Sequence, residues 1–200
     1  MGGAVKIVAF VIATACAVAA PGRAATMTKG ERQRLIAHLE MTAAWLETET
    51  AHLSRAQLEY HPGPGRWSVA DVVEHLHLSE PIYWRQLQDA LKDPPTDNKP
   101  RVTDLDVLWY GIDRTQRQQT SPDKVPQGPK ADFQASLTAV QKLHTEVLDY
   151  ARTTNDDLRG REMKGEGTDL YQWVLMISTH AQRHILQIRE IKADPGFPKK

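Results

Sequence analysis

The chain has 200 residues, of which 40% are hydrophobic, and this is enough for one globular domain with a substantial core. Its 25 basic and 25 acidic residues give a formal charge of zero, so the composition does not favour binding to nucleic acid.

The first 25 residues resemble a secretory signal peptide. Lys6 precedes a short apolar run, and Pro21 and several small residues follow that run. The run is too short for a membrane span, so we predict no transmembrane helix in the mature chain. Residues 26–200 are assigned to a single domain, and the protein is expected to be exported, either to the periplasm or out of the cell.

The only cysteine offers an alternative for this segment. Cys16 lies in Ala-Thr-Ala-Cys, which resembles the lipobox of bacterial lipoproteins except that the usual Leu is absent. A lipid anchor at Cys16 is the less favoured alternative, and the favoured one is a cysteine that leaves with the signal. In that case the mature chain has no disulfide and no thiol nucleophile.

A first helix is predicted over residues 27–58. Thr28 and Glu31 form the pattern of a capping box at its start. Leucines recur along it at spacings of four and seven: Leu35, Leu39, Leu46 and Leu53. The sequence Pro-Gly-Pro-Gly after His61 must end any helix.

A second helix is predicted from residue 69 to about residue 92, with Ser68 as its N-cap. His75 lies on the flank of its apolar stripe. Glu80 falls inside the apolar sector, which is unexpected for a carboxylate. Pro81 predicts a kink or a break, because it removes a backbone hydrogen bond.

The connection that follows, residues 93–130, is rich in proline. A structureless segment of about 38 residues is unusual in a compact domain and is often functional. Its one apolar island, residues 105–112, is consistent with a short helix. Two interpretations remain open: a lid over a pocket, or a long crossover that its aromatic residues hold against the domain.

The third and fourth helices are predicted over residues 131–152 and 168–192. His144 lies on the apolar face of the third helix, where a histidine is more often a satisfied core residue than a ligand. Four long helices joined by one long crossover predict an all-α four-helix bundle.

His180 and His184 stand in the middle of the apolar stripe of the fourth helix. Residues at i and i+4 project the same way, so the two rings can share one ligand. Buried histidines need a partner, and a divalent metal would provide one. Ala181 replaces the glutamate of the zincin motif, which excludes that class of protease. His75 is the best third ligand, since it lies at a similar depth.

Two segments resemble the DinB/YfiT-like superfamily: residues 62–76 and residues 180–188. They contain the Trp67-Ser68 opening of the second helix, a histidine eight residues after the tryptophan, and the closing pattern H-x-x-x-H-x-x-Q-[IL]. Leu186 stands where the family often has glycine. The resemblance implies a bundle of up-down-down-up connectivity, with the long crossover between the second and third helices. It also implies a metal site formed by His75, His180 and His184.

The resemblance leaves the activity open. Relatives include transferases and isomerases that use mycothiol or bacillithiol, and metal-dependent hydrolases. Those thiols are cytoplasmic, and the predicted export therefore lowers the weight of a thiol transferase. Ligation by histidine alone suits Zn, Ni or Fe and does not select one of them.

The carboxylates near the predicted site are candidates for a general base. Glu80 and Glu74 are the two candidates for this catalytic role, although a solvated helix carboxylate is the simpler explanation of each. Asp71 could instead orient His75, and Gln187 lies one turn beyond His184, where it could touch the site.

Three hypotheses of function follow. The favoured one is a divalent-metal-dependent hydrolase or transferase that acts on a small molecule. The second is a metal-binding or stress-related bundle without catalysis, and the third is a plain bundle whose histidines form a hydrogen-bonded cluster. The sequence leaves a homodimer open.

Overall fold

The computed structural model describes residues 26–116, 118–128 and 132–199. The predicted signal peptide, with Cys16, lies outside these residues. Among the helices that are described, none combines the length and the apolar character that a membrane span requires.

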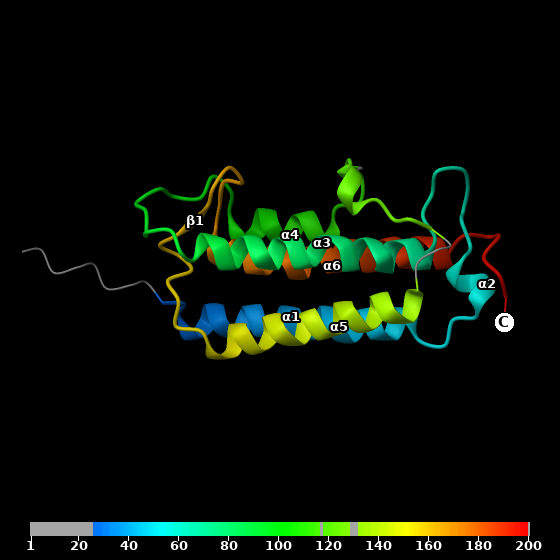
Figure 1. Ribbon diagram of the computed structural model, residues 1–200, viewed down its shortest axis with the longest axis horizontal. Helices are drawn as coiled ribbons and strands as arrows, with labels where there is room; N and C mark the ends of the chain where they lie inside the picture. Colours follow the sequence, from blue (N-terminus) through cyan, green and yellow to red (C-terminus); the bar gives the residue numbers. More distant parts are fainter. Residues whose placement is uncertain (1–25, 117, 129–131, 200) are drawn as a thin grey trace, which may run out of the picture.

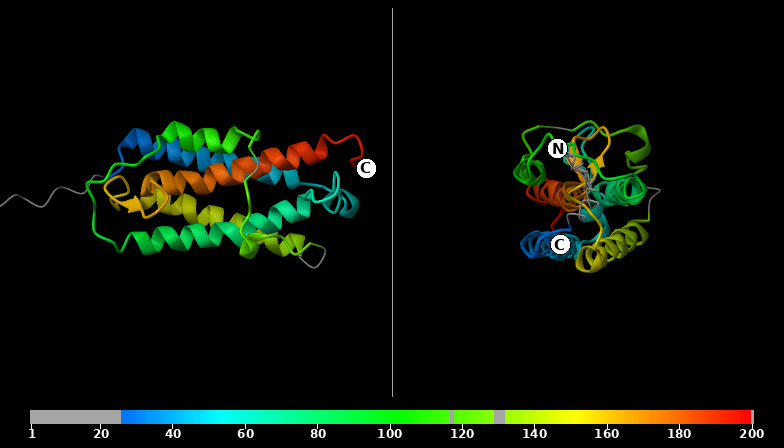
Figure 2. Two further views of the ribbon diagram at one scale, coloured as in Figure 1. Left: turned by 90° about the horizontal axis from the view of Figure 1, so that it is seen from above. Right: turned by 90° about the vertical axis from the view of Figure 1, so that its left-hand side faces the viewer.

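Four long helices form the bundle: α1 (Lys29–Thr50), α3 (Val69–Ala90), α5 (Phe133–Thr153) and α6 (Leu170–Lys192). Helices α1 and α6 run in one direction, whereas α3 and α5 run in the other (Figure 1). Both α1 and α3 pack against α5 and α6 (Figure 2). The predicted four-helix bundle and its up-down-down-up connectivity are therefore confirmed.

The long crossover has a topological reason. Because α3 and α5 are parallel, the chain must return along the whole bundle between them. On the way it forms α4 (Asp104–Ile112), which packs along α6, and the 3-10 turn η1 (Pro122–Lys124), which contacts α3. The short helix predicted in the apolar island is confirmed by α4.

Gly111 allows α4 to approach α6 closely. A Cβ atom at this position would lie 2.9 Å from Cβ of Thr179 and 2.7 Å from Oε1 of Gln182, both on α6. Any larger side chain at Gly111 would push the two helices apart.

The helix starts follow the sequence signals closely. Thr28 and Glu31 form the expected capping box at the start of α1. Ser68 caps α3, and its hydroxyl accepts a hydrogen bond from the backbone N–H of Asp71.

The first helix is shorter than predicted. It ends at Thr50, and a separate helix α2 (Arg55–Leu58) begins after Ser54. His52 has a φ of 58°, a left-handed backbone conformation that cannot continue a right-handed helix. The single helix over residues 27–58 was therefore wrong.

Two further details differ from the expectations. Of the kink or break expected at Pro81, the break does not occur, and α3 continues as one helix from Val69 to Ala90. A short antiparallel hairpin, β1 (Glu162–Met163) and β2 (Thr168–Asp169), precedes α6, and β2 takes the first two residues of the predicted fourth helix. The fourth helix therefore begins two residues later than predicted.

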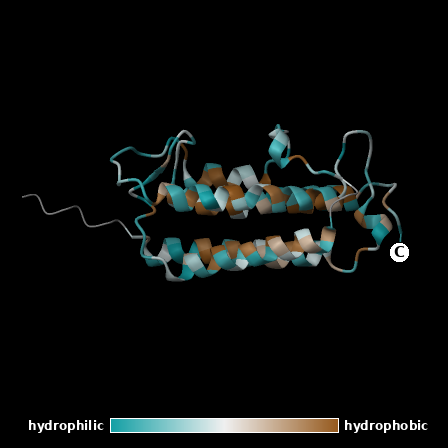
Figure 3. Cartoon of the chain, in the orientation of Figure 1, coloured by the Kyte–Doolittle hydropathy of each residue, from teal (hydrophilic) through white to brown (hydrophobic). Residues whose placement is uncertain are grey.

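Each long helix turns apolar residues inward, and hydrophilic residues predominate on the outer faces and the loops (Figure 3). Several polar side chains nevertheless lie in the interior. The most notable of these on α3 and α6 are His75, Glu80, His180 and His184. They form the candidate site.

Candidate metal centre

Helix α6 contributes two of the three histidines. His180 and His184 are one turn apart, so both rings project from the same face toward α3. Their ring centroids are 4.6 Å apart. Only 3% of His180 and 8% of His184 is exposed, so both rings are withdrawn from solvent.

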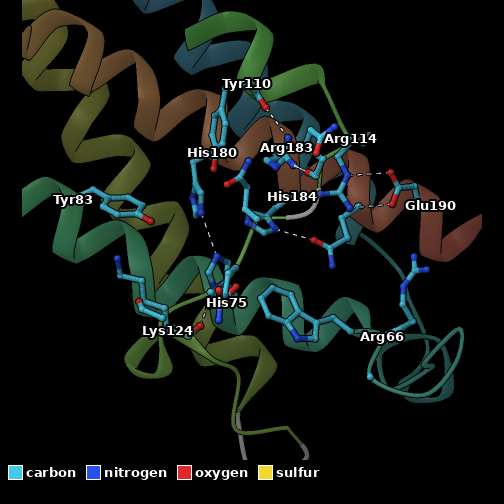
Figure 4. Close-up of a pocket in the computed structure, with 18 residues that line it drawn as sticks. Arg66, His75, Tyr83, Tyr110, Arg114, Lys124, His180, Arg183, His184 and Glu190 are labelled. Atoms are coloured by element: carbon cyan, nitrogen blue, oxygen red, sulfur yellow. Dashed lines mark hydrogen bonds and ion pairs between the residues drawn. The ribbon is translucent and has the colours of Figure 1, made fainter. Parts of the chain in front are cut away.

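Helix α3 contributes the third histidine. Nε2 of His75 lies 3.2 Å from Nε2 of His180. One ring nitrogen from each of His75, His180 and His184 lies within 4.8 Å of the other two (Figure 4). The structure thus brings together the three residues that the sequence singles out as ligands.

The opposite nitrogen of each ring, Nδ1, contacts one oxygen atom. These oxygens are the Lys124 carbonyl at 2.8 Å from His75, Glu80 Oε1 at 3.4 Å from His180 and Gln187 Oε1 at 3.0 Å from His184. Each oxygen accepts a hydrogen bond, so Nδ1 carries the proton of the neutral ring. In the neutral rings Nε2 carries the lone pair, and Nε2 of His75 and Nε2 of His180 face each other.

This geometry fits a divalent ion. Two histidine ligands on a tetrahedral zinc ion, each bound at the usual Zn–N distance, lie about 3.3 Å apart. The 3.2 Å between Nε2 of His75 and Nε2 of His180 matches that separation. Without a cation, this close approach requires a proton on one of the two Nε2 atoms, which His180 can supply only as an imidazolium paired with Glu80.

Burial keeps two of the rings neutral. The pKa of His75 is lowered to about 4: burial is the largest cause, the nearby His180 adds to it, and the hydrogen bond to the Lys124 carbonyl opposes it. Burial, with the proximity of His180 and His75, also holds the pKa of His184 well below its usual value. Neutral imidazole is the form that binds metal ions.

Glu80 is the most deeply buried carboxylate near the site, with no exposed surface. Its Oε1 contacts His180, and its Oε2 lies 2.7 Å from Nε2 of His144 on α5. Burial alone would raise the pKa of Glu80, but the charge and hydrogen bonds of His144 and His180 lower it to about 2. Glu80 therefore orients His180, while His144 satisfies Glu80.

The other two predicted carboxylates have structural contacts. Glu74 accepts a hydrogen bond from the backbone N–H of Gln127 at 3.0 Å. Asp71 accepts one from the backbone N–H of Ser68 and also pairs with His61. The expectation that Asp71 orients His75 was wrong, because the Lys124 carbonyl occupies Nδ1 of that ring.

The histidines open into a cavity of about 660 Å³. Trp67 lines it, with its ring centroid 4.9 Å from that of His75 and 6.1 Å from that of His184. Gln187 also lines the cavity and holds His184, as its spacing suggested. Neither Glu80 nor Glu74 is among the lining residues, so neither is placed to contact a substrate directly.

Arg183 fastens the crossover to α6. Its guanidinium donates hydrogen bonds to the backbone carbonyls of Tyr110, Asp113 and Gln116. Trp109, in contrast, is 63% exposed and cannot hold the segment down. Arg183 thus holds the end of α4 and the residues after it against α6, and the crossover forms one wall of the cavity. Nothing in the sequence indicated this role, because the partners of Arg183 are backbone atoms.

The fold and the histidine group define an all-α bundle with a centre suited to a metal ion. The sequence model of the DinB superfamily matches residues 34–188, and the chain belongs to this superfamily. This confirms the resemblance found in the sequence.

The chain also matches a solved structure described as "YfiT from Bacillus subtilis is a probable metal-dependent hydrolase with an unusual four-helix bundle topology". The TM-score is 0.57 at 23% sequence identity, and the match covers 87% of this chain and 93% of that one. The similarity supports the bundle topology. No curated protein gives a significant match to the chain.

Proposed function

We propose that this protein is a divalent-metal-dependent hydrolase of a small molecule, with His75, His180 and His184 as the ligands of the ion. The observation that carries the proposal is the convergence of one ring nitrogen from each of the three histidines, with an oxygen in contact with Nδ1 of each ring. The description of YfiT as a probable metal-dependent hydrolase agrees with it.

A hydrogen-bonded histidine cluster explains the contacts less well. A bond between His75 and His180 needs a proton on one of the two Nε2 atoms. A neutral ring protonated there would turn a lone pair at Nδ1 toward the Lys124 carbonyl or the Glu80 carboxylate, and both of these are acceptors. A His180 imidazolium between Glu80 and His75 avoids this conflict but does not engage His184, whereas a divalent ion engages all three rings.

The chain's own residues hold and orient the ion and shape the space in front of it. The three imidazoles would hold the ion beside the cavity, and Trp67 lines that cavity next to the rings of His75 and His184. When bound, such an ion acts as a Lewis acid and makes water a nucleophile at neutral pH. Glu80 keeps the His180 ring in position for ligation and is not assigned the role of general base.

Hydrolysis is favoured over thiol transfer by the predicted signal peptide. If residues 1–25 direct export, the domain works where the cytoplasmic thiols are absent and water remains available as the nucleophile.

The test is a screen of small esters and amides with the protein loaded separately with zinc, nickel and iron. His75→Ala should abolish turnover of any substrate that the wild type hydrolyses. His38→Ala removes another partly buried histidine, outside the centre, and should retain activity. Equal turnover by wild type and His75→Ala with every substrate would reject the proposal.

A further inference from the structure

The cavity beside the three histidines is lined by more positive than negative side chains. Four are cationic and one is acidic: Arg66, Arg114, Lys124 and Arg183 against Glu190. Arg114 and Glu190 neutralise each other through two hydrogen bonds of 3.0 Å. Three positive charges therefore remain without a carboxylate partner in the lining.

Arg183 is the most deeply buried of these cations, with only 3% of the residue exposed. Its hydrogen bonds go to backbone carbonyls, which satisfy the N–H groups but carry no net charge. A buried charge without a counter-ion is costly. An anion in the adjoining cavity would offset that cost.

Lys124 lies on another side of the histidine group (Figure 4). Its carbonyl holds His75, which fixes its backbone next to the centre. Its ammonium group lies 4.7 Å from the centroid of the Tyr83 ring. Within the described part of the chain, no carboxylate is within ion-pair distance of Lys124 or of Arg66.

We propose that the cavity binds a small organic anion, a carboxylate or a phosphate, with its charged group beside Lys124 and its reacting bond toward the histidines. Lys124 is the favoured contact because its ammonium has no hydrogen-bond acceptor among the described residues, whereas the guanidinium of Arg183 already donates to three carbonyls. As a statement about the substrate, this inference rests on the proposed function. Gln116, Gln118, Thr120 and Ser121 also line the cavity and can hydrogen-bond the remainder of the molecule.

Isothermal titration calorimetry on the mature chain tests this inference. Three compounds are titrated into metal-free protein: succinate, inorganic phosphate and the uncharged dimethyl succinate. Succinate and dimethyl succinate are also titrated into zinc-loaded protein. Lys124→Gln removes the charge and leaves the backbone carbonyl that holds His75. Lys142→Gln is the matched control, since Lys142 is exposed on α5 and does not line the cavity. Circular dichroism confirms that each variant is folded.

We expect at least one of succinate and phosphate to bind, and the stronger of the two identifies the preferred anionic group. Lys124→Gln should weaken that binding about tenfold, as expected for the loss of one charge-assisted contact. Lys142→Gln should leave it unchanged, and if succinate binds, dimethyl succinate should bind more weakly. Succinate binding that its ester equals, equal losses in both variants, or no binding of either anion would overturn the inference.

The outcome separates the two proposals. Loss of anion binding in Lys124→Gln, with no hydrolysis by any metal-loaded form, supports the anion site and rejects the hydrolase. Hydrolysis of neutral esters that depends on His75, with anion binding unaffected by Lys124→Gln, rejects the anion site and supports the hydrolase.

Discussion

Buried or partly buried histidines lie at two opposite faces of α6: His38 at one, and His75, His180 and His184 at the other. The two groups differ in which ring nitrogens have hydrogen-bond partners. On one face, His38 from α1 contacts Ser178 through Nδ1 at 2.7 Å and Gln182 through Nε2 at 3.2 Å. Both nitrogens of that ring are satisfied by hydroxyl or amide groups, which leaves no lone pair for an ion. We call His38, Ser178 and Gln182 the closed group, because its ring nitrogens already have partners in the protein.

On the other face, His180 and His184 meet His75, and among the described residues only the Nδ1 atoms of these rings have oxygen partners. Nε2 of His75 faces Nε2 of His180, and all three histidines line the cavity. Burial of a histidine is therefore a poor guide to metal binding by itself. The informative observation is which nitrogen remains unsatisfied after the protein's own hydrogen bonds have been assigned.

The largest expected effect is the loss of the ion in His184→Ala. The wild type should bind about one equivalent of zinc, and free zinc at about a thousand times its Kd should raise the free energy of unfolding by about 4 kcal/mol. The variant should bind less than about half an equivalent and gain no such stability. Elemental analysis and urea denaturation with and without zinc measure both quantities. A variant that keeps full occupancy would contradict the assignment of His184.

Glu80→Gln should reduce zinc affinity by about 10- to 100-fold, because it weakens the acceptor that orients His180. Glu74→Gln is the matched control. Glu74 is also a buried glutamate of α3, but its contact is with the backbone of Gln127. Competition with a chromogenic chelator gives the two affinities. Equal losses in both variants would show that Glu80 has no special role.

Acidification should destabilise the metal-free protein in two stages. The unfolded chain takes up a proton on His75 near pH 6.5, whereas folded His75 has a pKa of about 4, so the free energy of unfolding should fall between these values. The pKa of Glu80 is lowered from 4.5 to about 2, so its contribution should be lost below about pH 4.5. Urea midpoints from pH 7 to pH 3 measure the decline. A constant midpoint between pH 7 and pH 4 would contradict the burial of neutral histidines.

The smallest effect on the metal is expected for the closed group. His38→Ala should lower the free energy of unfolding by about 1–3 kcal/mol, because Ser178 and Gln182 lose a buried partner. Zinc stoichiometry and affinity should not change. A loss of zinc as large as that in His184→Ala would mean that the two groups are coupled, which would remove the distinction drawn between them.

Much of the scaffold was predictable from the sequence because its signals are local. The capping residues Thr28 and Ser68 mark the starts of two helices, and the spacing of His180 and His184 places both rings on one face. The break before α2 was missed, although Ser54 and Gln57 form a legible capping box. The leucine spacing continued through the break and concealed it.

The surroundings of the centre were less predictable. Glu80 and His144 each stood out as polar residues on apolar faces, and that shared oddity could have suggested their pairing across α3 and α5. The acceptor for His75 could not have been found in this way, because it is the backbone carbonyl of Lys124 in a proline-rich crossover. A carbonyl has no signature in the residue types, and its position depends on the path of the whole segment.

The central claim is that one ion is held between α3 and α6 by three imidazoles. Anomalous scattering at the zinc absorption edge, from crystals of the zinc-loaded protein, tests it most directly. We predict a single strong peak about 2.1 Å from Nε2 of each of His75, His180 and His184. Data of adequate strength with no peak between these rings, or with zinc bound only elsewhere on the chain, would contradict the account.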